Sequence, residues 1–121
     1  IKEKNKNTLF HIDAVQAFGK YKIDVKKFKC DMLSASAHKF NGPKGVGLFY
    51  MKKGLKVKPL LLGGGQQSGQ RPGTENAAGA AAMAVAAQDA YKNLEESNKK
   101  IYDLKKHLGR GFGQLFKRRI G

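Results

Sequence analysis

The sequence is poor in several residue types, and each shortage excludes a class of protein. It has one cysteine in 121 residues, Cys30, so an internal disulfide framework is excluded and a reducing, cytoplasmic location is expected. No apolar run approaches the roughly 20 residues that span a bilayer, so no membrane partner is expected. Residues 1–7 are basic and polar, unlike a secretory signal. The sequence does not begin with Met, and we expect it to be a piece of a longer protein.

Acidic residues are also scarce: the chain has 9 of them against 24 lysines and arginines, a formal net charge of +15. Such a charge attracts polyanions. The lysines, however, are spread along the whole sequence without interleaved aromatic residues, and no helix-turn-helix or zinc-ligand pattern is visible. We therefore interpret the charge as a solvated surface, and we predict neither direct nucleic-acid binding nor a metal site.

The apolar runs predict the strands of an α/β fold. The first run is typical of a buried parallel strand, and a turn of helix closed by Gly19 follows it. A glycine-rich loop at 62–73 lacks the ending of a phosphate-binding P-loop. The predicted strands lie at residues 9–13, 31–36 and 45–51.

The last third of the sequence predicts helix. Thr74 is the predicted N-cap, and the alanine-rich residues 77–90 have narrow side chains that permit close packing, so this half is expected to be buried. The second half is amphipathic as far as Leu108. After Gly109 the pattern degrades, and no stable structure is predicted there.

Residues that follow the predicted strands suggest a chemistry. Asp13 ends the first strand and Lys39 lies just beyond the second, and ligands of open α/β sheets bind beyond such strand ends. A lysine can form an imine with the aldehyde of pyridoxal 5′-phosphate (PLP), and a carboxylate can keep its pyridine nitrogen protonated. Ser36 and His38 precede Lys39 closely enough for one loop to hold both ends of that cofactor. Taken alone, Lys39 is one of 24 basic residues, and a surface lysine is the alternative.

Four motifs occur in order along the chain: HIDAVQ at 11–16, SASAHKFNGPKGVG at 34–47, GGGQQ at 63–67 and RPGTEN at 71–76. With them the chain resembles the cysteine desulfurases, which are class V aminotransferase-type PLP enzymes of fold type I. The match extends over residues 8–108 and is closer to the NifS/IscS-like group than to the SufS-like group.

The resemblance implies an α/β fold that is part of the fold type I large domain, a mostly parallel sheet with flanking helices, followed by a long helix. Residues 1–90 would be a portion of the PLP-binding large domain. Residues 91–121 would be a helix leading toward the small domain, with an irregular basic tail.

The resemblance also implies roles for individual residues. Lys39 would be the Schiff-base lysine and would then move protons on the substrate. Asp13 would pair with the pyridine nitrogen, and Gln16 would donate to the phenolic oxygen of the cofactor. Ser36 and His38 would bind its phosphate.

Other positions have different expectations. Thr74 would reach the phosphate of a neighbouring subunit, which implies a homodimer. Arg71 has no firm role beyond support of its loop, and His11 is expected to be an orienting residue at the strand end. Cys30 is expected to be a buried or half-buried packing residue and not a nucleophile.

The implied activity is conversion of L-cysteine to L-alanine with persulfide formation, and the sulfur would pass to an acceptor protein for iron–sulfur cluster assembly or tRNA thiolation. The family's phosphate loop and ring-stacking histidine would lie upstream of this sequence, and its nucleophilic cysteine and substrate-binding arginine downstream. Two alternatives stay open. One is a related PLP enzyme, such as a selenocysteine lyase or another aminotransferase. The other is a non-catalytic basic module that binds RNA or a partner.

Overall fold

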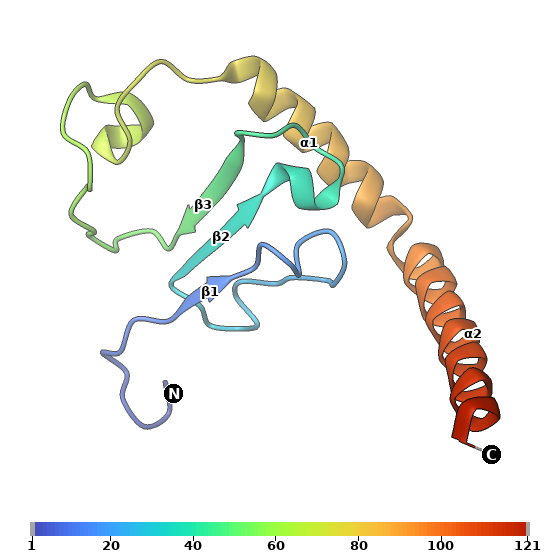
Figure 1. Ribbon diagram of the computed structural model, residues 1–121. Coiled ribbons are helices and arrows are strands. Elements are labelled where there is room, and N and C mark those ends of the chain that lie inside the picture. The colour runs from blue at the N-terminus through green and yellow to red at the C-terminus, as the bar shows by residue number, and fades with distance from the viewer. Residues whose placement is uncertain (1, 121) are drawn as a thin grey trace.

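The computed structural model describes residues 2–120, with side chains described as far as Arg110. A three-stranded sheet is followed by two long helices, so the predicted α/β class is confirmed (Figure 1). The elements in chain order are β1 (His11–Asp13), β2 (Met32–Ser36), the 3₁₀ helix η1 (Ala37–Phe40), β3 (Gly47–Met51), the 3₁₀ helix η2 (Gln66–Gly69), α1 (Ala77–Lys92) and α2 (Leu94–Ile120).

The strands lie in the order β1-β2-β3, and β2 is the central strand. β1 runs parallel to β2, as predicted, with Asp13 opposite Ser34. β3 is antiparallel to β2, with Gly47 opposite Ser36, so the sheet of the described residues is mixed. The connection over 37–46 explains this, because a parallel return requires a crossover of about a dozen residues or more.

The two faces of the sheet differ in character. Side chains alternate along a strand, so Leu33 and Ala35 of β2 point to one face, where both are buried. Ile12 of β1 and Leu48 and Tyr50 of β3 pack against that cluster. The opposite face carries the remaining residues of the three strands, and His11 and Asp13 on it are exposed. The prediction that β1 is buried is therefore wrong for this chain.

α1 covers the end of the sheet that carries η1. Met83 of α1 packs with Ala37 and Phe40 of η1, and all three are buried. The approach is close at Gly79, where an added Cβ would lie 2.7 Å from Cγ2 of Val46. Gly19 has a similar restriction: its φ is +75° and an added Cβ would lie 2.7 Å from the Phe40 Cβ. The predicted turn closed by Gly19 is thus confirmed, with Phe18 N–H donating to the Ala14 carbonyl at 2.8 Å.

Three predictions about the helices are wrong. The N-cap of α1 is Asn76, not Thr74, because the Asn76 side chain accepts the Gly79 N–H at 2.9 Å. The alanine-rich half is mostly exposed, since only one stripe of α1 packs inward. Residues after Gly109 continue α2 to Ile120 instead of forming an irregular tail. Glycine weakens a helix by about 1 kcal/mol relative to alanine but does not end it as proline does, and no proline follows Pro72.

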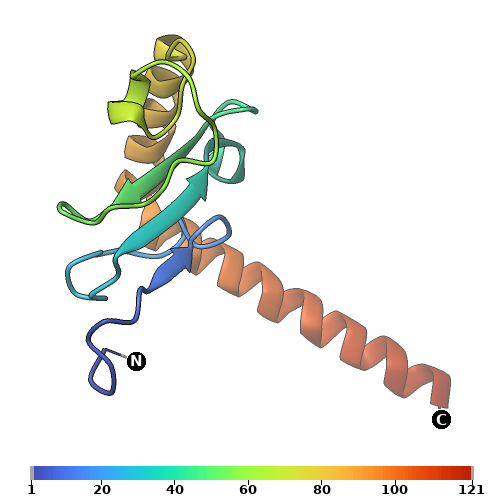
Figure 2. The same ribbon diagram turned by 90° about the vertical axis from the view of Figure 1, so that its left-hand side faces the viewer.

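α2 leads away from the sheet (Figures 1 and 2). Its first turns are tied to the segment after β1, where Asn98 Nδ2 donates to the Lys20 carbonyl at 2.8 Å. Farther along, Ile101, Leu104 and Leu108 are about 60% exposed. None of the helices in residues 2–120 combines the length and the apolar composition needed to span a membrane.

Candidate functional site

The carboxyl end of β2 is built to expose polar groups above a buried support. Ser36 is extended, with φ −127° and ψ 127°, and η1 begins directly after it. A 3₁₀ helix has three residues per turn, so Ala37 and Phe40 share its inner side. Both are buried, whereas His38 and Lys39 between them are exposed. The sequence therefore places the Lys39 amine in solvent on a short helix whose other side is anchored in the core.

Backbone hydrogen bonds hold this loop at both ends. Ala37 N–H donates to the Val46 carbonyl at 3.0 Å, and Gly42 N–H donates to the Ala37 carbonyl at 2.9 Å. Asn41 closes η1 in the left-handed conformation, with φ 65°. The loop that carries Lys39 is consequently fixed to β3 as well as to β2.

Ser36 and His38 lie together, as their predicted shared role requires. The Ser36 hydroxyl and the His38 Nδ1 atom are hydrogen-bonded at 2.9 Å. A hydroxyl and an imidazole that face the same exposed side of the loop are suitable donors for a phosphate group. Lys39 is the next residue, so the amine and the two polar groups emerge from one end of one strand.

Asp13 is fixed at the adjacent strand end. Its Oδ1 atom accepts the Val15 N–H at 3.0 Å, and Ala14 N–H donates to the Ser34 carbonyl at 2.8 Å, which continues the ladder between β1 and β2. Because β1 and β2 are parallel, the carboxyl ends of both strands meet at the same edge of the sheet. Asp13, Ser36, His38 and Lys39 are the predicted site residues that the fold brings to one edge.

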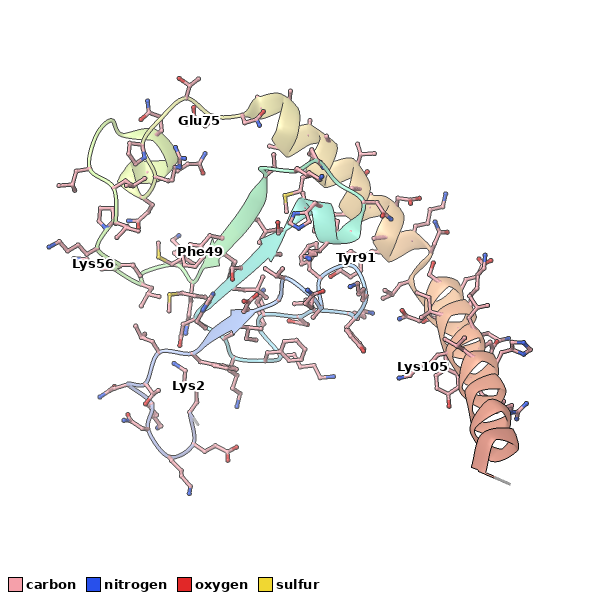
Figure 3. The ribbon with its side chains drawn as sticks, in the orientation of Figure 1. Lys2, Phe49, Lys56, Glu75, Tyr91 and Lys105 are labelled. Atoms are coloured by element: carbon pink, nitrogen blue, oxygen red, sulfur yellow. The ribbon has the colours of Figure 1, made fainter. Side chains whose placement is uncertain are left out.

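Two further residues lie on this face: Ser34, which was not predicted from the sequence, and His11, which was expected to be an orienting residue at the strand end. Ser34 lies opposite Asp13, and its hydroxyl is hydrogen-bonded to the His11 Nε2 atom at 3.1 Å. The His11 ring lies 6.1 Å from the ring of Phe49, which Figure 3 labels on β3. The alternation along β2 could have identified Ser34, because it is two residues before Ser36 and shares its face. His11 is thus oriented by neighbours on the sheet.

The remaining predicted residues form no side-chain hydrogen bond to this cluster among the described side chains. Gln16 is exposed in the turn after β1, and Thr74 is exposed before α1; the residue that follows it, Glu75, is labelled in Figure 3. Within the described side chains, neither forms a hydrogen bond to Asp13, Ser36, His38 or Lys39. Arg71 donates to the Pro72 carbonyl at 2.6 Å, within its own loop.

Cys30 is a packing residue. It is 2% exposed, and its thiol lies 3.7 Å from the Val25 carbonyl. Burial raises the pKa of the Cys30 thiol, which keeps it protonated and a poor nucleophile. The prediction of a buried cysteine is confirmed.

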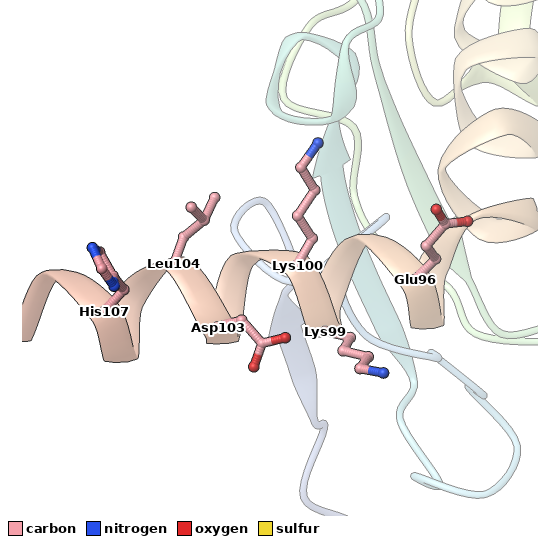
Figure 4. Close-up of a pocket in the computed structure, with 6 residues that line it drawn as sticks. All are labelled: Glu96, Lys99, Lys100, Asp103, Leu104 and His107. Carbon is pink, nitrogen blue, oxygen red and sulfur yellow. The ribbon is translucent and has the colours of Figure 1, made fainter.

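The hollows in the molecular surface lie elsewhere. One runs along a single stretch of α2, where Lys100 and Leu104 point to one side of the helix and Lys99 and Asp103 to the other (Figure 4). A surface made by one helix does not enclose a ligand. No group of three or more His, Cys, Asp or Glu side chains in the described part of the chain is placed to hold a metal ion.

The polar side chains at this edge of the sheet fit the functional groups of PLP. An exposed lysine amine on a rigid loop suits an aldehyde, the Ser36–His38 pair suits a phosphate, and the Asp13 carboxylate suits a protonated ring nitrogen. Each group would contact a different part of that cofactor, so the three would not compete for the same atom.

Comparisons with known proteins agree with this chemistry. The family model described as aminotransferase class-V matches residues 1–120. The chain is 51% identical over 108 residues to the cysteine desulfurase IscS of Clostridium botulinum (strain Hall), which is 89% of this chain and 27% of that protein. It is 46% identical over 103 residues to the cysteine desulfurase NifS of Azotobacter vinelandii, covering 85% of this chain and 26% of the relative.

Solved structures that resemble this chain include NifS-like proteins. A NifS-like protein superposes with a TM-score of 0.90 at 46% identity, over 94% of this chain and 31% of that one. A NifS-like protein from Rickettsia africae superposes with a TM-score of 0.88 at 30% identity, over 93% and 31%. The chain therefore spans between a quarter and a third of the length of these relatives.

Proposed function

The chain belongs to the aminotransferase class-V family, and from that premise we propose that it forms part of the PLP-binding edge of a cysteine desulfurase. The observation that carries the proposal is the exposed Lys39 amine beside the Ser36–His38 pair, at the same sheet edge as Asp13. The identity of 51% to a curated cysteine desulfurase supports it. The proposed reaction converts L-cysteine to L-alanine and leaves the sulfur on an acceptor thiol as a persulfide.

Each side chain of the proposed site has a separate role. When bound, PLP supplies an electron sink that stabilises negative charge on the substrate carbon. Lys39 would hold the cofactor aldehyde, and its amine nitrogen would carry a proton to and from the substrate. Asp13 keeps the ring nitrogen protonated through its negative charge, and Gln16 donates a hydrogen bond to the phenolic oxygen. Ser36 and His38 hold the phosphate, so the reacting end and the anchored end of the cofactor depend on one loop.

The proposal includes an assembly. Thr74 contacts the phosphate bound by a second copy of the chain, so the active form is a homodimer. A sulfur-acceptor protein, for iron–sulfur clusters or tRNA thiolation, receives the persulfide sulfur. The single cysteine, which lies buried as a free thiol, is compatible with the proposed cytoplasmic location.

The covalent link to Lys39 tests the proposal directly. The natural polypeptide that carries these residues is incubated with PLP, reduced with borohydride and digested, and the peptides are weighed. We expect the pyridoxyl mass on Lys39, its loss in Lys39→Ala, and its retention in Lys44→Ala, which removes an exposed lysine from the same loop. A pyridoxyl group on Lys44, or on no lysine, would overturn the PLP assignment.

A second measurement tests the substrate. The same polypeptide is supplied with L-cysteine and a thiol reductant, and alanine and sulfide are quantified together. Equal amounts of both products are expected. Release of alanine from selenocysteine alone, or amino-group transfer to an oxo acid without sulfide, would instead identify a different class V reaction.

A further inference from the structure

One buried carboxylate joins three separate segments at the edge of the sheet opposite the candidate site. Asp31, directly before β2, is 5% exposed. Its Oδ2 atom accepts the Phe10 N–H at 2.9 Å and forms a salt bridge with Lys2. The Asp31 backbone N–H donates to the Phe10 carbonyl at 2.9 Å, and its own carbonyl accepts the Lys52 N–H at 2.8 Å. The N-terminal segment, the β1–β2 connection and the exit of β3 are thereby held together.

All three segments are rich in lysine. Figure 1 shows them around the amino-terminal end of β2, and Figure 3 labels Lys2 there. We use the name basic edge for the eight lysines that these three segments carry: Lys2, Lys4, Lys6, Lys26, Lys27, Lys29, Lys52 and Lys53.

Most of the charge at the basic edge is not neutralised. Lys2–Asp31 is the one salt bridge found among the described side chains. The segments contain two other acidic residues, Glu3 and Asp24, and Asp24 accepts the backbone N–H groups of Lys26 and Lys27 at 2.9 and 3.0 Å. Apart from Lys2, the lysines of the basic edge are exposed. A gathered excess of one sign produces a strong local potential that attracts a polyanion.

The basic edge also carries an aromatic ring. Phe28 stands between Lys27 and Lys29 and is 43% exposed. Proteins that bind single-stranded nucleic acid combine lysines along the phosphate backbone with exposed aromatic rings on which bases stack. An acidic protein surface would use the lysines but has no flat base to stack on Phe28.

We propose that the basic edge binds single-stranded nucleic acid through its phosphate backbone. We predicted no such binding from the sequence, because the lysines are spread along the chain and no aromatic interleaving was recognised. Phe28, between Lys27 and Lys29, corrects the second point. Spacing along the sequence, however, does not report distance in space, and the hydrogen bonds of Asp31 bring three of the lysine-bearing segments together. The proposal is independent of PLP, since the basic edge lies at the other end of β2.

Two variants with equal loss of charge provide the test. Lys26→Gln/Lys27→Gln/Lys53→Gln removes three lysines of the basic edge. Lys99→Gln/Lys100→Gln/Lys105→Gln removes three exposed lysines of α2 and serves as the matched control. Binding of a fluorescein-labelled oligouridylate of about 15 nucleotides to the natural polypeptide is followed by anisotropy between about 50 and about 200 mM salt.

We expect the control to bind as the unaltered protein does. The variant of the basic edge should bind more weakly, and its slope of log K against log salt should fall by up to about 2, since each single-strand phosphate contact contributes about 0.7. Phe28→Ala should weaken binding roughly tenfold and leave the salt slope unchanged, because stacking involves no counterion release.

Three results would overturn the proposal. Equal weakening by both triple variants would mean that net charge alone attracts the oligonucleotide. Equally tight binding of an oligoglutamate of the same charge would assign the surface to an acidic protein. Absence of binding at about 150 mM salt would mean that the basic edge is only a solvated surface.

Discussion

The two ends of β2 differ in whether their polar side chains are exposed or buried. At the carboxyl end, Ser36, His38 and Lys39 project outward from a loop whose support is apolar, because Ala37 and Phe40 are buried beneath them. At the amino-terminal end the polar residue itself is buried, since Asp31 is 5% exposed and forms a salt bridge with Lys2. Hydrogen bonds hold both ends, but only the first leaves polar side chains exposed, those of His38 and Lys39.

The difference in exposure suggests a structural role for the buried carboxylate and a chemical role for the exposed one. Asp31 uses its carboxylate for one lysine and one backbone N–H, so its hydrogen-bonding capacity serves the fold. Asp13 has its Oδ1 atom hydrogen-bonded to the Val15 N–H while its side chain stays exposed on the sheet face. The two aspartates thus give different expectations: removing the charge of Asp13 should affect chemistry, and removing that of Asp31 should affect stability.

The largest expected effect concerns Asp13. Asp13→Asn keeps the size and shape of the side chain but removes the charge that, in the proposed function, would hold the ring nitrogen protonated. Turnover of L-cysteine should fall by about 10²-fold or more, since single electrostatic contacts to a reacting centre have that magnitude. The melting temperature should change little, because the side chain is exposed. Asp24→Asn is the control. Near-normal turnover in Asp13→Asn would mean that Asp13 has no role in the reaction.

The support beneath the site gives the next largest effect. Phe40 is 4% exposed and its ring centroid lies 5.0 Å from that of Phe18, so Phe40→Ala should lower the free energy of unfolding by about 3–5 kcal/mol. Phe49→Ala removes the same ring from an exposed position, and it should cost much less. Chemical denaturation of both variants measures the difference. Equal losses would mean that η1 is not anchored by its buried ring.

How far the sequence predicts this architecture depends on the range of the interaction. The strands and the Lys39 loop follow from local patterns, and the residues of the motif at 34–47 are sufficient to identify the loop. The exposed alanines of α1 did not follow, because which stripe of a helix is covered depends on residues distant in sequence. The Asn76 cap and the antiparallel β3 were missed although local signals exist: Asn76 accepts the N–H of Gly79, three residues later, and the connection over 37–46 is too short for a parallel crossover. Asp31 was also missed, since its role depends on Lys2 and Phe10, which are distant in sequence.

The smallest expected effect belongs to Asp31 and depends on pH. The salt bridge with Lys2, followed by the Phe10 N–H, lowers the pKa of the Asp31 carboxyl below its ordinary value of 3.8. A carboxyl whose pKa is lowered by folding contributes stability above its unfolded pKa and loses that contribution as the pH falls through its folded pKa. Asp31→Asn should therefore destabilise the protein at pH 7, and the deficit relative to the unaltered protein should shrink as the pH falls below about 4.

Lys2→Met separates the two partners of that carboxyl. It removes the larger cause of the lowered pKa and keeps the Phe10 hydrogen bond, so the pH-dependent deficit of Asp31→Asn should become smaller in the Lys2→Met background. Urea denaturation of the four proteins of this cycle, at pH 7 and near pH 3, measures the coupling. If the deficit of Asp31→Asn is the same at both pH values, the carboxylate charge contributes nothing, and the amino-terminal end of β2 is held by its backbone hydrogen bonds alone.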